Sequence, residues 1–214
     1  MSSIKSISFI AMIAMTIISF SNFFGLGIAG LSVLIGILFF FIDRTLNKQD
    51  PSSKVLNLRD IRNNLKDKSI CLWIGFPLLM NLVCFILATL FLPEFIEHTF
   101  ERTQFVLSAD KVLLLVLQLA LLAFGEEIAW RGFFQRNLSK MIPIVPALIV
   151  TSILFSIGHF AFGNTVIVTY DIFFIFINSI LYGIVFYKTN NVWLSAFSHF
   201  IANLFAFILM FIFS

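Results

Sequence analysis

Only a few side chains in the apolar stretches of this sequence ionise, and they are of the types that hydrolytic chemistry requires. The stretch GEEIAWRGFF, residues 125–134, follows the apolar run VLLLVLQLALLAF and carries two adjacent glutamates and an arginine. Two later apolar stretches carry one histidine each, in FSIGHF and SHFIAN. An ionisable residue at the centre of a membrane segment costs about 2.5–3.5 kcal/mol, so each one is a candidate functional residue.

Helical spacing separates the two glutamates. Glu127 and Arg131 are four residues apart, so they lie on one face of a helix and can form an ion pair. Glu126 is rotated from Glu127 by about 100° and has no charged partner on its own helix. We therefore expect Glu127 and Arg131 to support the structure. Glu126 is expected to face the interior of a bundle and to act as a general acid or base.

Each histidine has a companion at the same four-residue spacing: Phe155 precedes His159, and Asn203 follows His199. Glu126 and His159 have the chemistry to hold and deprotonate a water. His199 and Asn203 have N–H groups for an oxygen that becomes negative. Helix lengths leave one point open, because counting from the segment ends places Glu126 ~8–15 Å deep and His159 ~20 Å deep. The helix of His159 must tilt, or start outside the hydrocarbon, to bring the two level.

These residues belong to a chain that is apolar over most of its length. Hydrophobic residues make up 60% of the 214 positions, charged residues make up 12%, and 29 residues are Phe, which excludes an ordinary soluble domain. A helix needs about 20 apolar residues to cross a membrane. About seven segments approach that length: 4–21, 23–42, 70–92, 109–131, 143–162, 170–187 and 192–213. The sequence thus predicts an all-α, polytopic bundle of transmembrane helices.

The positive charges gather in one loop rather than along a nucleic-acid-binding face. They lie in or beside residues 43–69: Arg44, Lys48, Lys54, Arg59, Arg62, Lys66 and Lys68. The positive-inside rule then predicts a cytoplasmic loop and a cytoplasmic N-terminus. The net charge of +3 therefore indicates no nucleic-acid partner. The frequent Phe, Ile, Asn and Lys favour an AT-rich bacterial genome, and hence a multi-pass protein of a bacterial cell membrane.

We divide the chain into N-terminal transmembrane helices, residues 1–105, and a C-terminal helical core, residues 106–214. The basic loop 43–69 belongs to the first part. Within it, VLNLRDIRNNL is either a short interfacial helix or part of a solvated linker.

One histidine and two pairs of small residues are interpreted as non-catalytic. His98 has no partner that the sequence can identify, so we interpret it as an ordinary exposed histidine. Small residues four apart, Ser32 with Gly36 and Ser179 with Gly183, predict that their helices approach neighbouring helices closely.

Three motifs in this order resemble those of a known family. They are EExxxR at Glu126, Glu127 and Arg131, FxxxH at Phe155 and His159, and HxxxN at His199 and Asn203. On successive apolar helices they resemble the CAAX prenyl protease type II and bacteriocin-processing family, also called CPBP or Abi. The resemblance covers about residues 109–207 and implies an intramembrane peptide hydrolase.

The resemblance also implies a role for each motif residue. Glu126 would activate a water with His159, and His199 with Asn203 would stabilise the oxyanion. The remaining motif residues would be structural supports: Glu127, Arg131 and Phe155. The family is often labelled metalloprotease, and a zinc site would use Glu126, His159 and His199. We favour no metal or other cofactor, because a carboxylate base and separate oxyanion donors already supply each role.

The expected substrate is a hydrophobic peptide or a membrane-associated protein in the lipid bilayer. Bacteriocin maturation, signal-peptide maturation and self-immunity are the candidate processes, and a bacterial origin disfavours prenylated substrates. Two other functions stay open: a non-catalytic immunity or scaffold protein, and a small transporter. The sequence has no internal repeat of the kind that many transporters show, which makes the transporter the weaker alternative.

Overall fold

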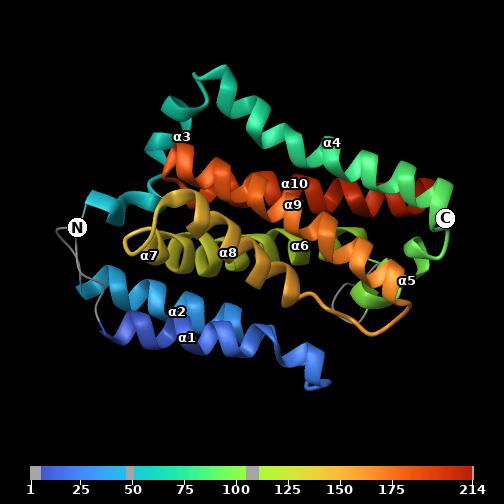
Figure 1. Cartoon of the computed structure of the whole chain (residues 1–214). Helices are drawn as coiled ribbons and strands as arrows, with labels where there is room; N and C mark the ends of the chain where they lie inside the picture. The colour runs from blue at the N-terminus through green and yellow to red at the C-terminus, as the bar shows by residue number, and fades with distance from the viewer. Residues whose placement is uncertain (1–5, 47–50, 105–110, 214) are drawn as a thin grey trace.

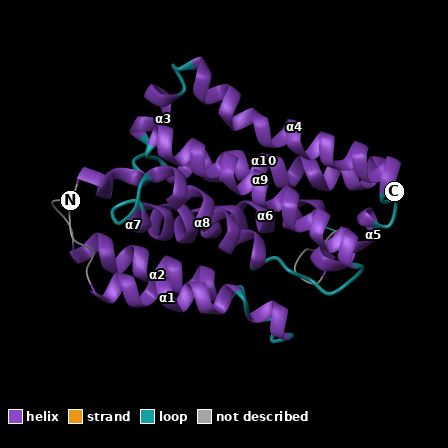
Figure 2. Cartoon of the chain, viewed as in Figure 1, coloured by secondary structure: helices purple, strands orange, loops and turns teal. Residues whose placement is uncertain are grey.

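The structure is a computed structural model that describes residues 6–46, 51–104 and 111–213. Within these residues the regular structure is helical (Figure 2), and no strand occurs. The longer helices are α1 (Ser6–Ser19), α2 (Leu31–Leu46), α4 (Lys68–Phe91), α5 (Phe95–Gln104), α6 (Val112–Glu127), α8 (Ile144–Ile157), α9 (Thr165–Thr189) and α10 (Val192–Phe213). The predicted all-α bundle is confirmed.

Shorter helical pieces connect these helices. They are η1 (Ser21–Phe24), η2 (Pro51–Leu56), α3 (Arg59–Asn64), η3 (Ile128–Gln135) and α7 (Arg136–Leu138). Lys48 and the predicted boundary at residues 105 and 106 lie outside the described residues. The division of the chain at that boundary and the cytoplasmic N-terminus stay predictions.

Helix α10 lies at the centre of the bundle (Figure 1). It packs against α4, α6 and α9, and α9 in turn packs against α4 and α8. The hairpin of α1 and α2 lies on the other side of the molecule, where α2 packs against η3 and α1 contacts α8. Segments from both ends of the chain therefore surround the helix that carries the two glutamates.

Polar residues mark the ends of the two longest single helices. Asp67 precedes α4 and accepts a hydrogen bond from the Ser69 N–H at 2.8 Å. Asn164 caps α9 in the same way, accepting from the Val166 N–H at 2.9 Å. Asn190, with φ of 47°, ends α9 in the left-handed conformation that often stops a helix. The turn to α10 is consequently only two residues long, which places α9 and α10 side by side.

Four helices in the described residues are long and apolar enough to cross a membrane. They are Lys68–Phe91, Val112–Leu138, Thr165–Thr189 and Val192–Phe213, of 22 to 27 residues. The other three predicted segments also form helices, α1, α2 and α8, but these have only 14 to 16 residues. A 16-residue helix is about 24 Å long, so these three fall short of the full ~30 Å hydrocarbon thickness.

The distribution of polarity is that of a membrane protein. Large aliphatic side chains lie on the outer surface, among them Leu113, which is 85% exposed, and Ile10, which is 64% exposed. Glu127 and Arg131, in contrast, are fully buried. Charges paired inside a bundle with an apolar exterior are expected in a bilayer, where the surrounding solvent is hydrocarbon.

The small residues allow close helix approach, as predicted. A Cβ on Gly36 of α2 would lie 2.5 Å from the Ala129 Cβ of η3. A Cβ on Gly183 of α9 would lie 2.8 Å from the Gln135 side-chain oxygen. Both glycines thus bring a neighbouring helix against the segment that follows the two glutamates.

Part of the basic loop packs on the bundle. The Trp193 indole N–H donates to the Leu56 carbonyl at 3.0 Å, and the Asn191 amide donates to the Asn57 carbonyl at 2.9 Å. Val55 is fully buried. The stretch VLNLRDIRNNL does form a short helix, α3, which buries none of its residues. The segment is therefore partly docked against the start of α10, which a solvated linker would not be.

Candidate active site

The two glutamates lie at the end of α6, near the middle of the continuous 27-residue helix Val112–Leu138. Immediately after them the helix changes to π geometry in η3, whose eight residues are all buried. Such widened turns within helices are frequent at functional sites. The side chain of Glu126 is 18% exposed and that of Glu127 is 0% exposed, so only Glu126 is accessible.

Glu127 is held by Arg131, as predicted. The Arg131 Nη1 lies 3.1 Å from the Glu127 Oε1. Arg131 Nη2 donates to both the carbonyl and the hydroxyl of Ser179 on α9, each at 2.8 Å. The guanidinium also lies 4.8 Å from the Phe155 ring centroid. These contacts join α6, α8 and α9 around one buried charge pair.

His199 of α10 lies between the two glutamates. Its Nδ1 is 3.0 Å from the Glu127 Oε1, and its Nε2 is 3.6 Å from the Glu126 Oε2. A carboxylate only accepts, so the Nδ1 carries the hydrogen of that short contact. The ring also stacks on Tyr182 with centroids 4.3 Å apart. Sequence reasoning missed both the Glu127 and the Tyr182 contact, because each partner comes from a different helix.

His159 follows the end of α8 and faces Glu126. Its Nε2 lies 3.9 Å from the Glu126 Oε1, and its Nδ1 lies 2.8 Å from the Phe155 carbonyl oxygen. Because that oxygen can only accept, the ring hydrogen is on Nδ1 here as well. The FxxxH spacing thus places the backbone carbonyl of Phe155 where it orients the His159 imidazole.

The length of α8 bears on whether His159 lies at the same depth as Glu126. Its 14 residues are too few for a full membrane crossing, and it ends at Ile157. His159 therefore reaches the level of Glu126, as the 3.9 Å distance shows.

Asn203 lies one turn beyond His199 on α10 and is half-buried. In the described part of the chain, no contact joins its side chain to Glu126 or to either histidine. A hydrogen-bonded asparagine pair lies nearby. The Asn178 amide donates to the Asn81 side-chain oxygen at 2.7 Å, and the Asn81 amide donates to the Ala202 carbonyl at 2.8 Å. No spacing in the sequence predicts this pair, which ties α4 and α9 to α10 next to Asn203.

His98 is not an ordinary exposed histidine, and that interpretation was wrong. Its Nε2 lies 3.6 Å from the Oδ2 of Asp171, and its side chain is only 11% exposed. Arg102 also binds this carboxylate, with its Nε 3.0 Å from the Oδ2. Both Arg102 and Asp171 act electrostatically on His159. The fold creates this cluster by placing α5 against α9, which no spacing in the sequence indicates.

The described His, Cys, Asp and Glu side chains do not form a clear metal site. Among the described residues, no group of three or more His, Cys, Asp or Glu side chains is arranged to hold a metal ion. This holds for the zinc set of Glu126, His159 and His199 that the family label would suggest. We therefore derive no chemical step through a metal.

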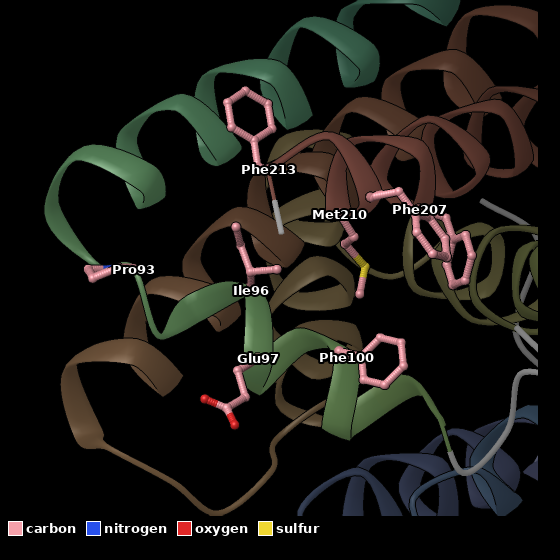
Figure 3. A pocket seen from close by; sticks show the side chains of 8 residues that line it. Pro93, Ile96, Glu97, Phe100, Phe207, Met210 and Phe213 are labelled. Carbon is pink, nitrogen blue, oxygen red and sulfur yellow. The ribbon is translucent and has the colours of Figure 1, made fainter.

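An apolar cavity lies beside the site rather than in it. It has a volume of about 480 Å³ and is lined by α5 and the last turns of α10 (Figure 3). Its lining residues are Pro93, Ile96, Glu97, Phe100, Phe207, Met210, Phe211 and Phe213. The cavity begins one helical turn after Asn203, at Phe207, and contains neither histidine nor glutamate of the site. The converging polar groups, and not this cavity, define the candidate active site.

Comparison with known families gives a match over the same region. Residues 108–205 match the family described as type II CAAX prenyl endopeptidase Rce1-like. This segment is thus similar to the Rce1-like family. The match covers just under half of the chain and includes all three motifs. Comparisons with curated proteins and with solved structures gave no match.

The matched family is one of peptide hydrolases, and the four candidate spans are long and apolar enough for a membrane protein. The matched segment contains all of α6, η3, α8 and α9 and the first 14 of the 22 residues of α10. Helices α1, α2 and α4 lie outside it but pack directly on those helices.

Proposed function

We propose that the protein is an intramembrane endopeptidase in which Glu126 activates a water. The observation that carries the proposal is the convergence of two imidazole Nε2 atoms on one accessible carboxylate. His159 and His199 place these atoms 3.9 Å and 3.6 Å from the Glu126 oxygens. Both Nδ1 atoms are bound to acceptors, so in the neutral rings both Nε2 atoms present lone pairs.

The Glu126 carboxylate and the two imidazole Nε2 atoms are all hydrogen-bond acceptors, so a donor is needed between them. A water about 2.8 Å from two atoms can bridge any pair less than about 5.6 Å apart. The distances from Glu126 to both histidines fall well inside that limit. A water at this position would donate to Glu126 and to one imidazole, which is the orientation that exposes its lone pair to a peptide carbonyl.

The hydrolytic step follows from these contacts. Glu126 takes a proton from the water, and the hydroxide forms a bond to the carbonyl carbon of the scissile peptide. The carbonyl oxygen becomes an oxyanion, to which we propose that the Asn203 amide donates. The protonated Glu126 then gives its proton to the leaving nitrogen as the C–N bond breaks. The products are a carboxylic acid and an amine, so atoms and protons balance.

His199 has a part in both stages. Its Nδ1–H is bound to Glu127, which orients the ring so that its Nε2 faces the Glu126 carboxylate. We propose that Glu126 passes the proton of the water to this Nε2, which donates to the oxyanion and returns the proton before the C–N bond breaks. Arg131 neutralises the remaining charge on Glu127 and fixes the direction of its carboxylate.

We propose a hydrophobic or membrane-associated peptide as the substrate, because the site lies within an apolar bundle. Maturation of a bacteriocin or signal peptide, or self-immunity, are the processes that fit such a substrate. The family name indicates a prenylated CAAX protein as the other class. Two fluorogenic reporters separate the classes: a farnesylated peptide with a CAAX end, and an unmodified hydrophobic peptide with an internal cleavage site. Preferential cleavage of the farnesylated reporter would reject our choice of substrate.

Glu126→Gln in proteoliposomes tests the mechanism. Loss of a general base lowers turnover by about 10²–10⁴-fold, whereas the matched Glu101→Gln variant, at an exposed residue of α5, should cleave normally. Wild-type turnover by Glu126→Gln would reject the mechanism. No cleavage by the wild-type protein, with binding or protective activity unchanged in Glu126→Gln, would favour a non-catalytic binding protein.

Metal dependence requires a measurement of its own. We propose that the purified enzyme contains no stoichiometric zinc and keeps its activity after chelation. Zinc at one equivalent per chain, together with activity lost on chelation and restored by zinc, would contradict this proposal.

A further inference from the structure

We propose that Asn22, in the N-terminal hairpin, is a positioning residue for His159. Asn22 lies in η1, the short helical turn that follows α1. It lies outside the segment 108–205 that matches the Rce1-like family. This inference rests on the proposed function, because it assigns a residue that acts through His159.

The Asn22 carboxamide binds the backbone on both sides of His159. Its Nδ2 donates to the Gly158 carbonyl at 3.1 Å and to the Phe160 carbonyl at 3.2 Å. A carboxamide nitrogen carries two hydrogens, one for each of these acceptors. One side chain thus fixes the peptide group that precedes His159 and the one that follows Phe160.

The end of α8 explains why these carbonyls need an external partner. The last carbonyls of a helix have no N–H within the helix to accept from. The His159 N–H donates to the Ser156 carbonyl at 3.0 Å, three residues back, so the last turn is tightened. The Phe155 carbonyl is thereby left for the His159 ring, which donates to it at 2.8 Å. Asn22 satisfies the next carbonyls and holds this tightened turn.

Asn22 is itself held in one orientation. Its side-chain oxygen accepts from the Ala29 N–H at 3.4 Å, so its nitrogen must face the two carbonyls. An amide turned the other way would place oxygen against oxygen. The neighbouring Phe23 ring stacks on Phe160, with centroids 4.0 Å apart and planes 21° apart. Two adjacent residues of η1 therefore clamp the segment that carries His159.

The contacts of Asn22 and Phe23 determine where the His159 imidazole lies relative to Glu126. The His159 Nε2 lies 3.9 Å from the Glu126 carboxylate. The imidazole is oriented by the bond from its Nδ1 to the backbone carbonyl of Phe155. A displacement of about 1 Å at a catalytic group reduces the rate by up to about 10²-fold. Loss of these contacts should consequently lower kcat by a larger factor than it weakens substrate binding.

Asn22→Asp tests the inference in the full-length protein in proteoliposomes, with the farnesylated and the unmodified reporter peptides. Aspartate keeps the acceptor for Ala29 but replaces the donor with an oxygen. We expect kcat per folded enzyme to fall about tenfold or more, with KM changed less than about twofold. Asn22→Ala, which removes the donor without adding charge, should lower kcat in the same direction.

The matched control is Asn64→Asp. The Asn64 amide also donates to two backbone carbonyls, those of Asp60 and Thr189 at 3.0 Å and 3.4 Å. Thr189 lies at the opposite end of α9 from the His159 segment. Asn64→Asp should therefore lower the unfolding temperature without lowering kcat of the folded enzyme.

A double-mutant cycle separates positioning from a general structural effect. If Asn22 acts through His159, Asn22→Asp should lower kcat no further in a His159→Ala background. An equal loss in both backgrounds would overturn the inference, as would unchanged kcat per folded enzyme in both Asn22 variants. Wild-type turnover by Glu126→Gln or His159→Ala would instead reject the proposed function.

Discussion

Glu126 and Glu127 are neighbours in the chain, yet their carboxylates lie in different surroundings. Glu127 is fully buried and has an arginine at 3.1 Å and an imidazole at 3.0 Å. Glu126 is partly exposed, and its closest ionisable groups are two histidines at 3.6 Å and 3.9 Å. The first carboxylate is paired with a buried cation, whereas the second is partly exposed and lies farther from its partners. Residue type alone therefore does not assign a role, because the distances to the partners separate support from chemistry.

The largest effect on stability should come from breaking the Glu127 pair. Arg131→Met leaves a carboxylate buried without its cation, which should lower the free energy of unfolding by about 3–5 kcal/mol. Chemical unfolding in mixed micelles measures this loss. A loss below about 1 kcal/mol would show that the pair is not a structural support.

The control for that experiment removes both charges. Glu127→Gln combined with Arg131→Met leaves no unpaired charge, so it should recover part of the stability. Glu126→Gln provides the contrast, since Glu126 has no ionisable partner closer than 3.6 Å among the described residues. Its free energy of unfolding should change by less than about 0.5 kcal/mol, as for an ordinary surface substitution.

A smaller effect is expected at a third carboxylate, Asp171, which is buried but paired with the partly exposed Arg102. Arg102→Gln should lower the free energy of unfolding by about 1–2 kcal/mol, between the values for exposed and buried pairs. Thermal unfolding measures it, with the exposed Arg59→Gln as the control. A loss as large as that of Arg131→Met would mean that Asp171 depends on its cation as strongly as Glu127 does.

An effect smaller than that at Asp171 is expected at Ser179, whose hydroxyl is one of two acceptors for Arg131 Nη2. Ser179→Ala keeps the carbonyl acceptor, so the free energy of unfolding should fall by only about 1 kcal/mol. Turnover should stay within about threefold of wild type. Ser198→Ala removes a neutral hydrogen bond to the Ile74 carbonyl and is the matched comparison. A turnover loss as large as that of Glu126→Gln would place Ser179 in the chemistry instead.

Much of the fold and part of the site could be predicted from local patterns. Apolar segments of about 20 residues predict membrane helices because a bilayer core excludes unpaired backbone groups. The spacing of Glu127 and Arg131 predicted their ion pair, because residues four apart on a helix are neighbours. The lengths of α1, α2 and α8 were less predictable, since a loop within an apolar stretch depends on neighbouring helices.

Contacts between helices could not be predicted in the same way. The position of His98 beside Asp171 depends on how α5 crosses α9, and the bond from Asn22 to the His159 segment joins residues 136 and 138 positions apart. Neither sequence stretch contains a spacing that reports such a contact.

The sequence by itself determined the helical bundle, the three motifs and the ion pair of Glu127 with Arg131. Those features depend on apolar length and on the helical repeat, which are local properties of the chain. Only the tertiary structure decided that His159 lies level with Glu126, that His199 bridges both glutamates and that Asn22 reaches the active-site backbone. These depend on where helices end and how they pack, which the chain settles only when it is folded.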